Sequence, residues 1–117
     1  MNYLVPVVEA VVVDCVDPVA VAKFWQQLMG GELVWTDDGD VDLQGGPVRL
    51  YFQRVAHDAK RGKNPLHLDL RVPHDAHRQA IDRALSLGAT LAHDVYDGHA
   101  FQVLRDPAGN EFCLIWN

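Results

Sequence analysis

The feature that most constrains the fold is a repeat within the chain. Asp17 to Gly30 spans thirteen positions, and Asp75 to Gly88 spans the same number. Each stretch has the pattern of a helix, with an aspartate that can cap the first turn and a glycine that can end the last. Each also follows an apolar strand-like segment and precedes shorter ones. The chain therefore predicts two copies of a βαβββ unit, which is an α+β fold.

The two modules are expected to form a single domain, with module boundaries near residues 1–57 and 64–117 and a polar break at 56–65. Asp17 caps the first helix and Pro18 opens it, while Asp75 is expected to start the second. Apolar and alternating patterns predict strands at residues 4–13, 32–35, 41–43, 48–55, 66–72, 89–92, 100–104 and 112–116.

Charge and cysteine content exclude several classes of partner. The formal charge of −6 argues against nucleic acid or an anionic membrane. No apolar run has membrane-spanning length, and no signal segment is expected at the start. Cys15 and Cys113 are too few for a disulfide framework. We therefore expect a cytoplasmic protein with reduced thiols and no membrane partner.

Three strands alternate with a period of two, which separates an apolar face from a polar one. The apolar residues should pack on the helices. The other face collects Tyr51, Gln53, His67, Asp69 and Cys113. Two interpretations stay open: a sheet face that is simply solvated, or the wall of a cleft for a small organic ligand.

Other residues carry weaker signals. Trp35 and Phe101 are candidate cleft walls, although core packing explains them equally well. The acidic run at residues 37–42 lacks the closing glutamate of an EF-hand loop, so it is expected to be an exposed turn. His74 and His77, at the start of the second helix, are expected to be solvated.

The segment Arg105-Asp106-Pro107-Ala108-Gly109-Asn110-Glu111-Phe112-Cys113-Leu114 predicts a hairpin, because Asp-Pro starts a turn and Gly109 and Asn110 both tolerate positive φ. This Asp-Pro-x-Gly-Asn turn resembles the signature of the vicinal oxygen chelate, or glyoxalase-like, superfamily. The stretch from Asn64 to Leu70 (NPLHLDL) and the segment Asp14 to Pro18 agree with that resemblance. It implies a curved mixed sheet around a cleft, commonly in a homodimer.

Metal-dependent members of the superfamily use one ligand on each of four strands, usually histidine, glutamate or glutamine. Carried over by resemblance, these positions are His67, Cys113 in place of glutamate, either Tyr51 or Gln53, and Ala10. Ala10 cannot bind a metal, whereas a shift of one residue would bring in Glu9. The site is thus expected to be degenerate, and no cofactor is expected. The alternative is a divalent metal held by Glu9, Gln53 and His67.

Three functions follow from these expectations. The first is a small-molecule-binding protein of the bleomycin-resistance type that sequesters a toxic or signalling compound. The second is a lyase, an isomerase or a dioxygenase-like enzyme that uses a metal or the pair His67 and Asp69 as acid and base, with Cys113 as a candidate nucleophile. The third is a non-catalytic interaction module.

Overall fold

The computed structural model describes residues 8–56, 67–92 and 100–116. It divides the chain into two compact units, Met1–Ala56 and His57–Asn117. The predicted break between the modules falls largely on residues 57–66, which lie outside the described residues. No helix in the described part of the chain is long and apolar enough to cross a membrane.

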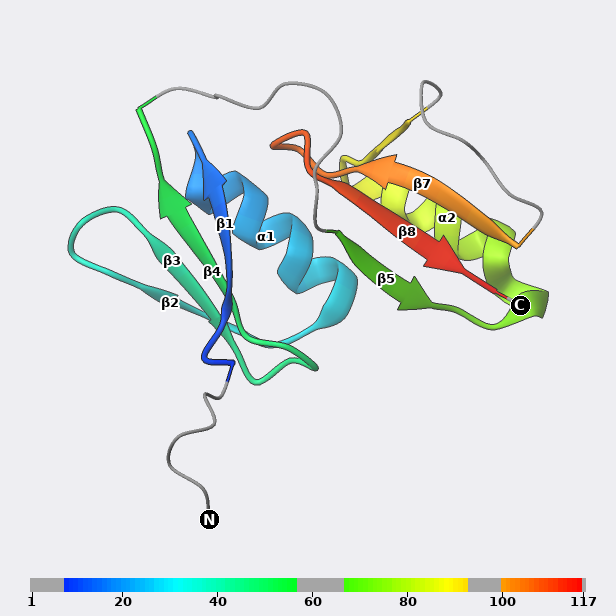
Figure 1. Ribbon diagram of the computed structural model, residues 1–117, viewed down its shortest axis with the longest axis horizontal. Coiled ribbons are helices and arrows are strands. Elements are labelled where there is room, and N and C mark those ends of the chain that lie inside the picture. The colour runs from blue at the N-terminus through cyan, green and yellow to red at the C-terminus, as the bar shows by residue number, and fades with distance from the viewer. Residues whose placement is uncertain (1–7, 57–66, 93–99, 117) are drawn as a thin grey trace, which may run out of the picture. The chain divides into compact units, whose positions relative to one another are not determined.

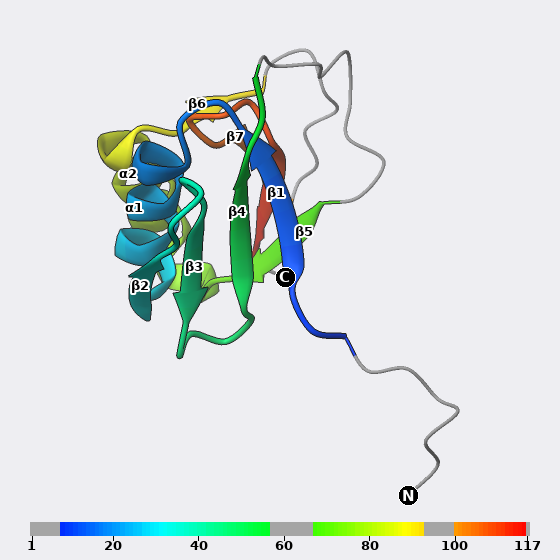
Figure 2. The ribbon, with the colours of Figure 1, turned by 90° about the vertical axis from the view of Figure 1, so that its left-hand side faces the viewer.

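The first unit has one helix and a four-stranded mixed sheet (Figure 1). Its strands are ordered β1-β4-β3-β2, with β1 and β4 parallel and the other neighbours antiparallel. Figure 2 shows α1 on one side of this sheet. The elements are β1 (Val11–Cys15), α1 (Pro18–Met29), β2 (Glu32–Trp35), β3 (Val41–Gln44) and β4 (Leu50–Arg54).

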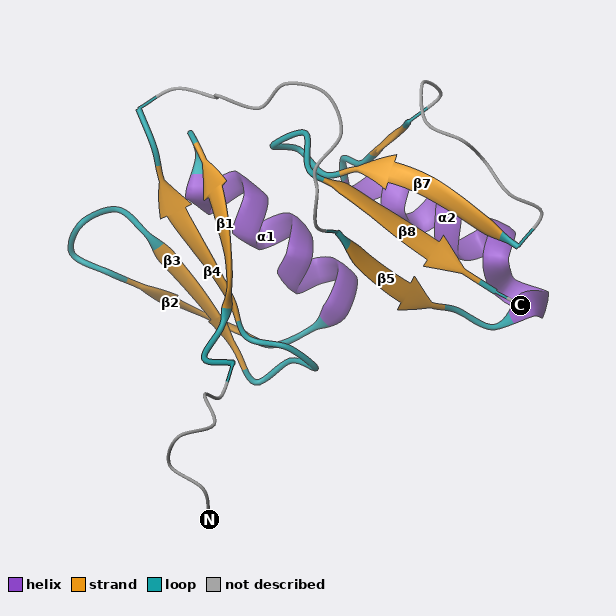
Figure 3. Cartoon of the chain, in the orientation of Figure 1, coloured by secondary structure: helices purple, strands orange, loops and turns teal. Residues whose placement is uncertain are grey.

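The second unit repeats this arrangement, with strand order β5-β8-β7-β6 and β5 parallel to β8 (Figure 3). The predicted α+β fold of two βαβββ modules is therefore confirmed, and each module has a sheet of its own. The elements are β5 (Leu68–Arg71), the 3₁₀ turn η1 (His74–Ala76), α2 (His77–Leu87), β6 (Thr90–Leu91), β7 (Phe101–Arg105) and β8 (Glu111–Ile115).

Each helix covers the apolar face of its own sheet. In the first unit Phe24 and Trp25 are buried and meet edge to face at 5.4 Å, while Phe52 of β4 is fully buried. In the second unit Ala84 of α2 and Phe112 of β8 are fully buried. This packing leaves the opposite face of each sheet without a helix of its own unit.

The first helix begins and ends where the sequence predicts. Asp17 accepts a hydrogen bond from the Ala20 amide at 3.3 Å, Pro18 is the first helical residue, and Gly30 is the C-cap. The second helix ends as predicted at Gly88, but its predicted start at Asp75 is wrong. The 3₁₀ turn comes first, closed by a hydrogen bond from the Ala76 amide to the Pro73 carbonyl, so Asp75 lies inside this turn.

Strand ends also differ from the predictions. The first strand was expected at residues 4–13, but β1 begins at Val11, where its pairing with β4 starts, and continues to Cys15. Residues 1–7 lie outside the described part. Pairing likewise limits the strand expected at residues 48–55 to Leu50–Arg54.

The predicted C-terminal hairpin is confirmed, and Asp106 organises its turn. The carboxylate of Asp106 accepts hydrogen bonds from the amides of Ala108 and Asn110, both at 2.9 Å. Gly109 has a φ of +86°. Asn110 does not share this conformation, since glycines alone have positive φ among the described residues; instead its side chain donates to Asp106 at 3.1 Å.

Candidate functional site

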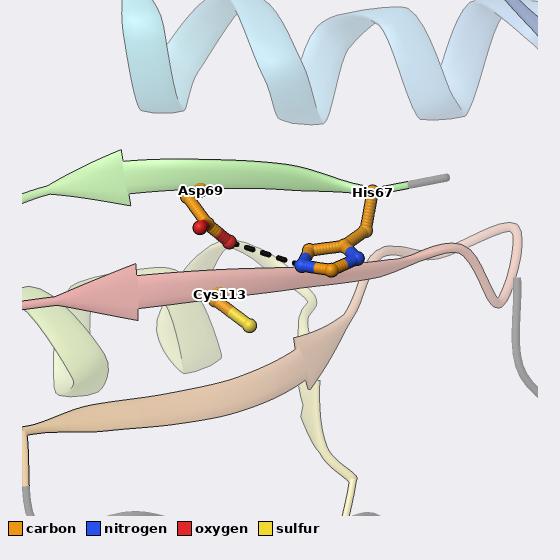
Figure 4. Close-up of side chains that lie close together, drawn as sticks. All are labelled: His67, Asp69 and Cys113. Carbon is orange, nitrogen blue, oxygen red and sulfur yellow. Dashed lines mark ion pairs between the residues drawn. The ribbon is translucent and has the colours of Figure 1, made fainter. Parts of the chain in front are cut away.

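Three side chains with metal-ligating or catalytic chemistry meet on the second unit's sheet (Figure 4). His67 and Asp69 are two positions apart, so they project to the same face of β5. The parallel pairing of β5 with β8 sets Asp69 beside Cys113. Nε2 of His67 lies 3.0 Å from Oδ1 of Asp69, and one ligand atom from each of the three residues lies within 4.8 Å of the others.

One side of this cluster is partly exposed to solvent and the other side is buried among apolar side chains. The side chains of His67 and Asp69 are 35% and 54% exposed, whereas Cys113 is buried. Cys113 packs with Ala92 and Val103, and the partly buried Phe101 packs against them. An exposed histidine–carboxylate contact therefore adjoins a buried apolar cluster on one sheet face.

The sequence leaves two interpretations of this face open, and the burial of Cys113 shows that the solvated one does not hold at this position. Glu111, two positions earlier on the same face of β8, is buried as well, with its side chain 2% exposed. Its Oε2 lies 3.8 Å from Nε of Arg105, the residue that it opposes on β7. Sequence reasoning placed Glu111 on this face but did not select it. The feature of the sequence that could have identified Glu111 is its position two residues before Cys113 on the same strand.

The candidate residues of the first unit lie on another sheet. Tyr51 donates a hydrogen bond to Oδ2 of Asp40 at 2.9 Å, and this bond raises the pKa of Tyr51 above its usual value. Gln53 is exposed and opposes Asp14 on β1. The ligand-binding roles of Tyr51 and Gln53 stay predictions.

The carboxylate of Glu9, the alternative metal ligand, forms an ion pair with an arginine side chain. Its Oε1 accepts a hydrogen bond from Nη1 of Arg49 at 2.6 Å, and the Glu9 side chain is 88% exposed. Arg49 also binds both oxygens of Asp42, at 3.0 and 2.8 Å. Those hydrogen bonds lower the pKa of Asp42. Glu9 therefore belongs to an arginine-centred network in the first unit.

The two aromatic candidates occupy different surroundings. Phe101 opposes Ile115 and lies on the face that carries Cys113. Trp35 opposes Val41, which opposes the fully buried Phe52, so Trp35 lies on the helix-covered face of its sheet. Trp35 is nevertheless 55% exposed, because β2 is the edge strand.

Two expectations about polar residues outside the site need correction. His74 is exposed as predicted, but His77 is half-buried and stacks on Trp116, with ring centroids 4.4 Å apart. The acidic run is not wholly exposed either, since Asp42 is buried against Arg49. Asp38 accepts a hydrogen bond from Thr36, which lowers the pKa of Asp38.

The divalent metal implied by the family resemblance can be tested against the donor atoms of this cluster. His67, Asp69 and Cys113 offer one nitrogen, one oxygen and one sulfur. This set suits a thiophilic ion such as Zn²⁺ and does not suit hard ions such as Mg²⁺ or Ca²⁺, which prefer oxygen ligands.

Comparison with known proteins identifies a family. Residues 10–115 match the glyoxalase-like domain. No curated protein matches the chain. Among solved structures, the fosfomycin resistance protein FosX from Mesorhizobium loti is 9% identical with a TM-score of 0.74, and the match covers 97% of this chain and 93% of that one.

Two further solved structures have the same fold. A glyoxalase/bleomycin resistance protein/dioxygenase family enzyme from Burkholderia phytofirmans PsJN is 22% identical, with a TM-score of 0.70 and coverage of 90% of this chain and 94% of its own. FosX from Listeria monocytogenes, solved with Mn(II) and sulfate, is 11% identical, with a TM-score of 0.73 and coverage of 97% and 91%.

Proposed function

Because the chain belongs to the glyoxalase-like domain family of the vicinal oxygen chelate superfamily, we propose that it binds a small organic molecule on the sheet face that carries His67, Asp69 and Cys113. The proposed role is sequestration of a toxic or signalling compound. The proposal does not require the metal set of Glu9, Gln53 and His67.

The observation that carries the proposal is that the exposed His67–Asp69 pair adjoins Cys113, which belongs to an apolar cluster bordered by the partly buried Phe101 on the same face. Even when both groups are charged, an exposed pair of this kind adds only about 0–1 kcal/mol to stability, so folding gives little reason for it. Ligand sites combine an apolar surface with a few convergent polar groups. The expected ligand is amphipathic, with a hydrogen-bonding group at His67 and an apolar part toward Phe101.

A second candidate function is favoured by the 3.0 Å separation between His67 and Asp69. This spacing allows the carboxylate to orient the imidazole, as a general acid–base pair requires. The corresponding activity would be that of a lyase or isomerase on the same ligand. Conversion of a bound compound that is lost in His67→Ala would favour this reading over sequestration.

The binding proposal can be tested with a thermal-shift screen of small amphipathic carboxylic acids, phenols and amines. Dissociation constants of the compounds that stabilise the protein would then be measured by calorimetry. We expect His67→Ala and Asp69→Asn to weaken binding at least about tenfold, which corresponds to the loss of one hydrogen bond to a charged group. His74→Ala is the matched control, because that side chain is 74% exposed and lies outside the cluster.

Equal affinity in all three variants would refute the proposed location of the ligand. A screen without any stabilising compound would refute small-molecule binding within these classes, and co-purification of a protein partner would then favour the non-catalytic interaction module.

We also propose a homodimer in a reducing, cytoplasmic setting. The superfamily resemblance supports the dimer, and the reduced state is supported by Cys15 and Cys113, which are not disulfide-bonded in the described part of the chain. Sedimentation equilibrium of the untagged protein should give twice the 13.1 kDa chain mass. A mass equal to one chain at micromolar concentration would refute the dimer.

A further inference from the structure

We infer that His67, Asp69 and Cys113 form a binding site for one thiophilic divalent ion, with Zn²⁺ as the matching ion. Two of the donors, His67 and Cys113, stand at ligand positions that the superfamily resemblance carries over. The set differs from the implied one because Asp69 is the third donor and a thiolate replaces the usual glutamate. This inference rests on the proposed function, because the ion would lie on the sheet face that is proposed to bind the small molecule. The bound ion would then help to determine which small molecules bind.

The backbone supplies the first part of the argument. Residues two apart on a strand place their side chains on one face, and a directly opposed residue on the neighbouring strand has its Cβ about 5 Å away. His67 and Asp69 have the first relationship, and Asp69 and Cys113 have the second. The close-up shows the three side chains lying close together (Figure 4), and this triangle would let them converge on one point above the sheet.

The distances supply the second part. Tetrahedral zinc has bonds of about 2.0–2.3 Å, so its ligand atoms lie about 3.3–3.6 Å apart. The His67–Asp69 separation is 3.0 Å, and all the donors lie within 4.8 Å of one another. Small side-chain rotations therefore suffice to reach coordination distance.

The donor chemistry decides which ion fits. A thiolate and an imidazole favour Zn²⁺ over Mn²⁺ or Mg²⁺, and a carboxylate completes a common type of zinc shell. Cys113 lies among Ala92 and Val103, where a thiolate without a cation would be costly. A bound ion would offset that cost.

Three protein ligands leave the fourth position of a tetrahedral ion open. With His67 and Asp69 partly exposed, this position would be on the solvent side of the cluster. It would accept a Lewis-basic group of an organic molecule, such as a carboxylate, a hydroxamate or a thiol. The inference thus narrows the ligand class from amphipathic compounds in general to metal-binding ones.

Cobalt(II) can report on this site without any enzymatic assay. Reduced, chelator-treated and untagged protein would be titrated with Co²⁺, followed by competition with Zn²⁺ and measurement of metal content after gel filtration. We expect one ion per chain and a thiolate-to-cobalt charge-transfer absorption in the near ultraviolet. Cys113→Ser should abolish this absorption, whereas Cys15→Ala should keep it, because Cys15 belongs to the first unit.

Affinity for Zn²⁺ should fall at least about tenfold in His67→Ala and in Asp69→Asn. These two variants also keep the test decisive if Cys113→Ser does not fold, because both substituted side chains are partly exposed. Retention of the charge-transfer absorption in Cys113→Ser would overturn the inference. So would an unchanged affinity in both other variants, or the absence of bound ion after titration.

The thermal-shift screen repeated on chelator-treated and Zn²⁺-loaded protein separates the two proposals. Compounds that bind equally well without metal, together with no Zn²⁺ binding, would refute the metal site and leave the proposed function standing. Zn²⁺ binding at the cluster without any organic ligand would refute the proposed function and leave the metal site standing.

Discussion

Removal of the Asp106 carboxylate tests how the hairpin between β7 and β8 is stabilised. Asp106 is 4% exposed and accepts two backbone hydrogen bonds at 2.9 Å in addition to the Asn110 side chain. The substitution Asp106→Ala leaves the amides of Ala108 and Asn110 without this acceptor. Those bonds hold the turn that connects β7 to β8, the strand of Cys113.

The magnitude follows from the two backbone bonds. A hydrogen bond to a charged group contributes about 1.5–3 kcal/mol. Ala108 and Asn110 are half-buried, so water can replace part of the loss. We expect Asp106→Ala to lower the free energy of unfolding by about 2–3 kcal/mol. With a urea m-value of about 1.5 kcal/mol/M, the midpoint should fall by about 1.3–2 M.

Equilibrium urea unfolding monitored by circular dichroism provides the measurement. Asp106→Asn is the matched control, because its amide oxygen can still accept both backbone bonds, and it should cost about 1 kcal/mol. A loss below about 0.5 kcal/mol in Asp106→Ala would refute the importance of these bonds. Equal losses in both variants would show that charge, and not the acceptor position, stabilises the turn.

Two further predictions concern the first unit. Gly31→Ala should cost about 2–3 kcal/mol, because φ is +103° and the new Cβ would lie 2.7 Å from the carbonyl oxygen of Gln44. Gly30→Ala should cost only about 1 kcal/mol, because φ is +86° but no atom lies within 4 Å of its Cβ; similar urea midpoints for the two variants would contradict this. The pKa of Asp42 is lowered mainly by its hydrogen bond with Arg49, so this carboxylate stabilises the fold above the ordinary carboxyl pKa of about 4 and loses that effect as the pH falls through the lowered value. The urea midpoints of the parent chain and Asp42→Asn should therefore differ at pH 7 and converge in acid, and a constant difference from pH 7 to pH 2 would contradict the linkage.

Features set by neighbouring residues could be predicted from the sequence. The Asp17 cap, Pro18 and the closing glycines of both helices depend on contacts within one helical turn. The start of α2 could not be found in the same way. An aspartate suits both an N-cap and a 3₁₀ turn, and the extended Pro73 with its hydrogen bond from Ala76 favours the turn here.

The candidate site was only partly predictable for a related reason. Alternation along one strand correctly places His67 and Asp69 together, which the 3.0 Å contact confirms. The burial of Cys113 and Glu111 depends instead on β8 being an inner strand between β5 and β7. The period of a single strand does not contain that information, because strand order is set by pairing between distant segments.

The parallel pairing of β5 with β8 has a consequence for the order of folding. Asp69 and Cys113 become neighbours although they are 44 positions apart in the sequence (113 − 69). Contacts of such high sequence separation form slowly, because the loop between them must first lose its conformational entropy. The cluster therefore does not exist on a chain that is still leaving the ribosome before β8 is made. A ligand or ion held there would therefore bind only a chain in which β8 has already paired with β5.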